Sequence, residues 1–211
     1  MFKRKTLLRM IFGAIIVLTA IGVVILVKLS HQSAIDLVNS PAMNLLPKTS
    51  GLYQSVLFRI MAKETSRLPQ VNSTEKMNED GMVSILHGII SEETRGYFDT
   101  FVADSSDGKP AQIIITIFTT EGDPIFINVL FDQVQYLAVV DKTHDRFNSA
   151  GEEDDKYCFD HMKIITNPET DTKFVVLTND SQLTFEQLRN AQIGSNMESI
   201  DSFQLFSFYE K

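Results

Sequence analysis

Residues 112–131 read QIIITIFTTEGDPIFINVLF and contain two apolar runs on either side of a polar turn. Isoleucines recur at every second position, at 113, 115 and 117 and again at 125 and 127, which is the periodicity of a β-strand. The turn at 121–124 is too short for a crossover, so the two strands are predicted to form an antiparallel hairpin. Both faces of the strands are apolar, which predicts a central hairpin in a sheet covered on both sides.

Further elements are expected around this hairpin. Ser50 and Ser91 are predicted N-caps of helices over 50–67 and 91–104, since each precedes a stretch with helical spacing of apolar residues. The other expected elements are strands at 82–90, 134–140, 157–166 and 173–178, a helix at 184–191 and an aromatic C-terminal strand or helix. The 91–104 helix would cover one face of the sheet, and the 50–67 helix or the aromatic C-terminus would cover the other.

Short links between successive strands favour antiparallel neighbours, because a parallel crossover needs a dozen or more residues. The predicted fold class is therefore α+β. It comprises an antiparallel β-sheet of four to six strands with one or two packed helices, preceded by a single transmembrane helix.

The transmembrane prediction comes from residues 10–27 (MIFGAIIVLTAIGVVILV), which form an 18-residue run without a charge. A helix rises about 1.5 Å per residue, so roughly 20 residues cross a hydrocarbon core of about 30 Å. Residues 10–28 are predicted to be a signal anchor. A cleaved signal peptide is the less favoured alternative, because Ser33-Ala34 is only a weak cleavage site, and a buried soluble helix is the other.

Charge is distributed very unevenly along the 211-residue chain. Its first 28 positions hold five of the 19 basic residues and none of the 27 acidic ones, so a net charge of −8 becomes −13 for the remainder. Basic residues remain on the cytoplasmic side of a membrane, which predicts a cytoplasmic N-terminus and an extracellular C-terminal domain. The predicted order is a cytoplasmic tail at 1–9, the anchor in the lipid bilayer, a juxtamembrane stalk with an amphipathic helix at 29–80, and an extracytoplasmic α+β domain at 81–211.

Few residues suggest catalytic or metal chemistry. The single cysteine, Cys158, excludes an intramolecular disulfide framework, and the C-x-x-H pair that it forms with His161 is too small for a zinc site, so no metal or cofactor is expected. A nucleophilic Cys158 would need a base such as His87 or His144 nearby in space. A buried thiol is favoured, and an intermolecular disulfide that would give a homodimer is kept as an alternative.

Three loop residues are the candidate binding residues: Glu121, Asp123 and His144. Gly122 supplies the positive φ of the turn between the central strands, which would leave Glu121 and Asp123 exposed at its tip. A structural turn is the favoured interpretation, and a binding site for a cation or a partner is the alternative. The acidic balance of the chain argues against a nucleic-acid partner, because phosphate backbones bind basic surfaces.

The stretch at 117–126 (IFTTEGDPIF) resembles the TTEGDPI core of a family of uncharacterised domains in small Bacillus-type surface lipoproteins. Residues 141–147 (DKTHDRF) are similar to the DNSRDKF segment of that family, and the likeness spans about residues 80–180. The family pattern has a lipid-modified cysteine and a cysteine pair. Cys158 matches the first cysteine of the pair, whereas Asn179 or a neighbour stands at the position of the second, and the lipid-modified cysteine has no counterpart in this chain. The resemblance implies a fold and a location at the surface of a Gram-positive cell, and no activity.

The predicted function is that of a single-pass membrane protein presenting an interaction or sensory domain, not an enzyme, at the bacterial cell envelope. An envelope protein or peptide would bind through loops at the sheet edge. One alternative is an envelope hydrolase or thiol enzyme using Cys158 with a histidine. Another is a structural subunit of a membrane complex that docks through the 50–67 helix.

Overall fold

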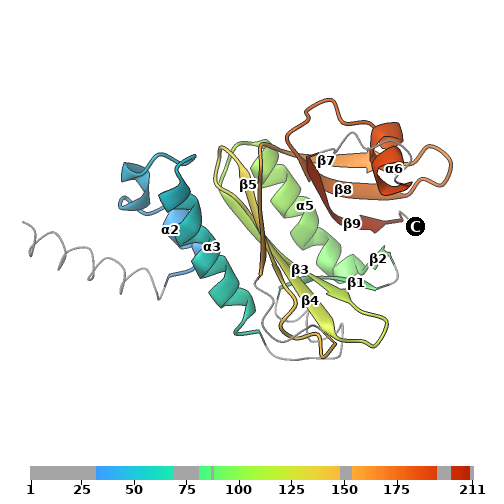
Figure 1. The fold of residues 1–211 in the computed structure, drawn as a ribbon, viewed down its shortest axis with the longest axis horizontal. Helices are drawn as coiled ribbons and strands as arrows, with labels where there is room; N and C mark the ends of the chain where they lie inside the picture. The colour runs from blue at the N-terminus through green and yellow to red at the C-terminus, as the bar shows by residue number, and fades with distance from the viewer. Residues whose placement is uncertain (1–31, 69–80, 87, 148–153, 194–200, 210–211) are drawn as a thin grey trace, which may run out of the picture.

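The computed structural model describes residues 32–68, 81–86, 88–147, 154–193 and 201–209 (Figure 1). They form a six-stranded sheet in the order β2-β1-β3-β4-β5-β6 and a three-stranded sheet in the order β7-β8-β9. The helices are α2 (Ala34–Val38), the 3-10 turn η1 (Met43–Leu45), α3 (Gly51–Thr65), α5 (Glu92–Ser106) and α6 (Phe185–Ile193). The strands are β1 (Val83–Leu86), β2 (Ile89–Ile90), β3 (Ala111–Phe118), β4 (Pro124–Phe131), β5 (Tyr136–Asp141), β6 (Asp155–Phe159), β7 (His161–Thr166), β8 (Lys173–Thr178) and β9 (Ser202–Phe208).

The predicted central hairpin is confirmed. β3 and β4 pair antiparallel along their whole length, from Ala111 opposite Phe131 to Phe118 opposite Pro124. Gly122 has a φ of +86° in the turn between them, a conformation that costs glycine little. β1 and β5 flank the hairpin, so its strands lie in the middle of the large sheet and both faces are available for packing.

The expected single antiparallel sheet is wrong on two counts. First, β1 pairs parallel with β3, with Val83 opposite Ile115, because the connection between them contains α5 and is long enough for a crossover. Second, the expected strand at 157–166 is two strands in different sheets: β6 pairs with β5 and β7 pairs with β8, and the chain turns between them at Asp160. The fold is α+β with one mixed and one antiparallel sheet.

The transmembrane element of the expected fold class is also corrected. Across the described ranges, no helix combines the length and the apolar character needed to span a bilayer. The predicted anchor at 10–28 lies outside those ranges. The first helix of the described residues is the short helix α2.

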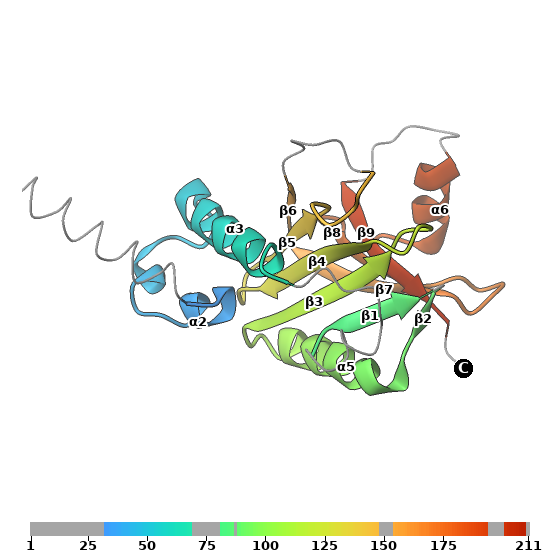
Figure 2. The same ribbon diagram turned by 90° about the horizontal axis from the view of Figure 1, so that it is seen from below.

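One face of the large sheet is covered by α2 and α3. Ser50 caps α3 as predicted, with its hydroxyl accepting a hydrogen bond from the backbone N–H of Tyr53. Tyr53, Leu57 and Met61 are at most 1% exposed and belong to a cluster that includes side chains of β4 and β5. The apolar stripe of α3 is thus buried within the fold, and Figure 2 shows α3 and α5 on opposite sides of the sheet.

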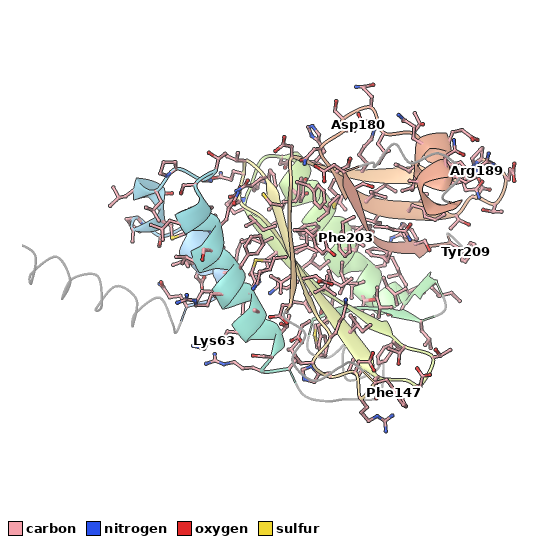
Figure 3. The ribbon with its side chains drawn as sticks, in the orientation of Figure 1. Lys63, Phe147, Asp180, Arg189, Phe203 and Tyr209 are labelled. Carbon is pink, nitrogen blue, oxygen red and sulfur yellow. The ribbon has the colours of Figure 1, made fainter. Side chains whose placement is uncertain are left out.

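The other face is covered by α5 and the three-stranded sheet. The Phe98 ring of α5 packs edge-on against Phe206 and Phe208 of β9, at centroid distances of 5.4 and 6.0 Å. Phe203, labelled in Figure 3, stacks on Tyr157 of β6 at 4.1 Å. Both covers considered from the sequence are therefore present, the 50–67 helix on one side and the aromatic C-terminus beside α5 on the other.

We expect Leu57→Ala to lower the free energy of unfolding by about 2–5 kcal/mol, because Leu57 is 0% exposed between α3 and the sheet. The matched control is Leu52→Ala on the same helix, which is 63% exposed and should change stability by less than about 0.5 kcal/mol. Urea denaturation followed by circular dichroism measures both. Equal losses for the two variants would contradict the packing of α3 on the sheet.

Candidate functional site

Two of the three predicted binding residues are engaged in contacts within the fold. Asp123 is 2% exposed, and its carboxylate accepts hydrogen bonds from Nε and the backbone N–H of Arg146 at 2.9–3.2 Å. The hydrogen bonds from Arg146 hold the pKa of Asp123 below its usual range. The expectation that Asp123 is exposed at the tip is wrong, because this ion pair joins the β3–β4 turn to the loop after β5.

His144 has a similar structural position, whereas Glu121 is exposed. The His144 ring meets Phe126 edge-on at a centroid distance of 5.1 Å, and Nε2 donates to the Leu68 carbonyl oxygen at 3.1 Å. His144 therefore links the loop after β5 to the residues that follow α3. Glu121 is exposed in the turn between β3 and β4, and its role in binding stays a prediction.

Cys158 lies in a polar cluster under the N-terminal half of α3. Its thiol donates to Oε1 of Gln135 at 2.9 Å, and the Gln54 side-chain amide approaches the sulfur at 3.4 Å. Burial, aided by the charges of Asp132 and Asp160, raises the pKa of the Cys158 thiol to about 11. The thiol is therefore protonated at neutral pH, which is the opposite of what a nucleophilic cysteine needs.

The histidines do not form a catalytic pair with Cys158 in the described residues. Cys158 pairs with Leu137 near the start of β5, whereas His144 follows the other end of that strand. His161 starts β7 in the second sheet and is exposed, and His87 lies outside the described residues. Within the ranges given above, no group of three or more His, Cys, Asp or Glu side chains could hold a metal ion.

A cavity lies at a different place, along the edge of β3. On β3, the partners of β1 are Ile115, Thr116 and Ile117, so the described strands leave residues 111–114 of β3 without a partner on this side. A cavity of about 750 Å³ adjoins this unpaired stretch. We call it the β3 groove.

The two walls of the β3 groove come from opposite faces of the sheet. The first wall is one face of α5, which contributes Tyr97, Thr100, Phe101 and Asp104. The second wall is the end of α3, which contributes Glu64, Arg67 and Leu68. Because the two helices cover opposite faces, the groove continues the plane of the sheet between them. A strand placed there would be covered on both faces, as the inner strands of the sheet are.

A hydrogen-bond network fixes the α3 wall. The Glu64 carboxylate accepts from the side-chain amides of Gln112 on β3, at 2.6 Å, and Asn128 on β4, at 2.9 Å. Its other oxygen accepts from the backbone N–H of Ala34 at 2.7 Å. Asn128 is fully buried and also donates to the Met61 carbonyl oxygen. The network therefore joins α2, α3 and the two central strands beside the groove.

The β3 groove was missed from the sequence. The sequence predicts one strand over residues 82–90, whereas β1 has four residues and the chain turns at Gly88. The groove lies before the other end of β1, because the parallel pairing with β3 begins only where Val83 meets Ile115. Gly88 has a φ of +75°, and a Cβ there would lie 3.1 Å from the Tyr209 ring. A glycine inside an apolar run is the signal that could have indicated this turn and the short β1.

A domain of unknown function, DUF4362, is found at residues 79–172. This range includes β1 to β7 and α5, and hence the β3 edge and the α5 wall of the groove, whereas the α3 wall precedes it. No curated protein and no solved structure matches the chain. The surface-lipoprotein setting and the TTEGDPI core of the resemblance noted from the sequence stay predictions.

We expect Glu64→Gln to destabilise the protein by about 1–3 kcal/mol, because an amide would turn two N–H donors toward the donors that the carboxylate now accepts from. Thermal and urea denaturation measure the loss. Glu169→Gln, at an exposed position in the β7–β8 turn, is the control and should be neutral. A neutral Glu64→Gln would contradict the structural role of the network.

Alkylation by iodoacetamide tests the state of Cys158. A pKa of about 11 in the folded protein, against about 8.5 in an unfolded chain, predicts a rate at pH 8 about a hundredfold or more below that in guanidinium chloride. The rate should rise with pH through a midpoint near 11. A midpoint below 8 would contradict the buried, neutral thiol and would favour a reactive one.

Proposed function

We propose that the protein is a binding module without catalytic activity, which takes up an extended segment of a partner protein in the β3 groove. The observation that carries this proposal is the unpaired stretch of β3 at residues 111–114, adjoining a cavity of about 750 Å³. An exposed strand edge presents backbone N–H and C=O groups in a row, and an extended peptide can satisfy them by adding a strand.

The shape of the groove supports this mode of binding. The Phe101 ring of the α5 wall and Leu68 of the α3 wall lie on opposite sides of the sheet, with the β3 edge between them. Tyr97 is 47% exposed at the same place and presents an aromatic face to an incoming segment. A strand in this position would form backbone hydrogen bonds to β3 and bury side chains on both faces.

The contacts within the fold argue against both alternatives, the enzyme and the structural subunit. The protonated thiol of Cys158 donates a hydrogen bond to Gln135, and His144 is bonded to the Leu68 carbonyl oxygen, so each is engaged in a structural contact. The apolar stripe of α3, which a structural subunit would use for docking, is packed against the sheet. The extracytoplasmic location and the envelope partner stay predictions from the sequence.

The experiment measures binding of a fluorescein-labelled peptide of sequence ITVTI to the full chain by fluorescence anisotropy. Strand addition requires the N–H groups of alternate residues, so N-methylation at the third position and at the fourth position should have different effects. One methylated peptide should lose binding by about tenfold or more, because its backbone hydrogen bonds are lost, and the other should bind normally. Absence of binding, or equal effects of the two methyl groups, would overturn the proposal.

Two variants place this binding in the β3 groove. Thr100→Trp puts a large ring on the α5 wall and should abolish peptide binding, whereas Ala103→Trp, at an exposed position of α5 outside the groove, should leave it unchanged. Thermal denaturation checks that both variants fold. Binding that survives Thr100→Trp in a folded protein would place the peptide elsewhere and contradict the assignment of the groove.

A further inference from the structure

The two walls of the β3 groove differ in their chemistry. Successive side chains of a strand point to opposite faces of a sheet, so an added strand would present one set of side chains to α5 and the alternate set to α3. The α5 wall carries the Tyr97 and Phe101 rings, and the Asp104 carboxylate there is paired with Lys109 at 3.4 Å. Apolar side chains fit this wall best.

The α3 wall carries a cation that can bind a ligand. Arg67 is exposed at the end of α3, and its guanidinium group has no ion-pair partner among the residues that the structure describes. The acidic neighbour on this wall is Glu64, one turn earlier, whose two oxygens accept three hydrogen bonds from Ala34, Gln112 and Asn128. The Glu64 carboxylate is therefore occupied by contacts within the fold, whereas no carboxylate in the described ranges binds the donors of Arg67, which can bind one from a ligand.

Resting on the proposed function, we infer that the β3 groove selects a strand with apolar and acidic side chains in alternation. The apolar side chains would face Tyr97 and Phe101, and an acidic one would face Arg67. The partner is thus a protein segment of alternating pattern that places a carboxylate on the α3 side. A segment with basic residues at the same positions would be repelled by Arg67 and disfavoured.

Two charged probes test this inference beside the neutral peptide ITVTI. The peptides IEVEI and IKVKI read the same in both directions, so their orientation in the groove does not affect the comparison. At low ionic strength the full chain should bind IEVEI about fivefold more tightly than IKVKI, the size of effect that an exposed ion pair produces. Added salt should reduce the difference by screening.

A charge reversal on the α3 wall tests whether Arg67 causes the preference for the acidic peptide. Arg67→Glu should invert the preference in favour of IKVKI, whereas Arg59→Glu, an exposed position of α3 outside the groove with the same change in net charge, should retain it. Binding of ITVTI to both variants shows that the groove is intact.

The outcomes separate the two proposals. If ITVTI fails to bind the native chain, the proposed function and this inference both fall. If ITVTI binds but IEVEI and IKVKI bind equally, or if Arg67→Glu leaves the preference unchanged, the strand-binding function stands and the selection for acidic residues is overturned.

Discussion

The Glu64 carboxylate is the point where three parts of the fold meet. It is bonded to the first turn of α2, lies on α3, and accepts hydrogen bonds from side chains on β3 and β4. A partly buried carboxylate needs this many donors, because desolvation without hydrogen bonds would disfavour its charge. The network therefore sets the position of α3 on the sheet, and with it the packing of Tyr53, Leu57 and Met61.

The same network determines the shape of the β3 groove. The cavity exists because α3 ends beside β3 at the place where β1 has not yet begun to pair. One wall therefore depends on Glu64, and the floor, which is the edge of β3, depends on the residue at which β1 begins. The DUF4362 domain at 79–172 contributes the floor and the α5 wall, whereas the preceding α2–α3 segment contributes the other wall. The groove is thus a joint product of the domain and the segment before it.

Local signals in the sequence predicted a large part of this fold. The hairpin of β3 and β4 followed from alternating isoleucines, and both N-caps followed from serine before an amphipathic stretch. Pairings at a distance were not predictable in this way. Nothing in the sequence around Asp160 distinguishes one long strand from two strands in different sheets, and counting only short links missed the parallel crossover through α5.

The candidate site was predicted less well, because its character depends on what lies opposite each residue. Asp123 in an isolated turn would be exposed, and it is buried because Arg146 arrives from a loop after β5. The pKa of the Cys158 thiol is raised mainly by burial, and the charges of Asp132 and Asp160 add to the effect, so its protonation depends on the residues that pack around it in the fold. The groove itself lies where α3 ends and where β1 and β3 begin, and periodicity gives such boundaries poorly.

The packing of β9 on α5 has a consequence for the order of events during synthesis. Phe206 and Phe208 contact Phe98, a residue more than a hundred positions earlier in the chain. Contacts at such separation form late and slow the folding of a domain, since a long loop must close before they contribute. The part of α5 around Phe98 therefore stays uncovered until β9 has been synthesised, and during that interval this apolar surface is open to aggregation.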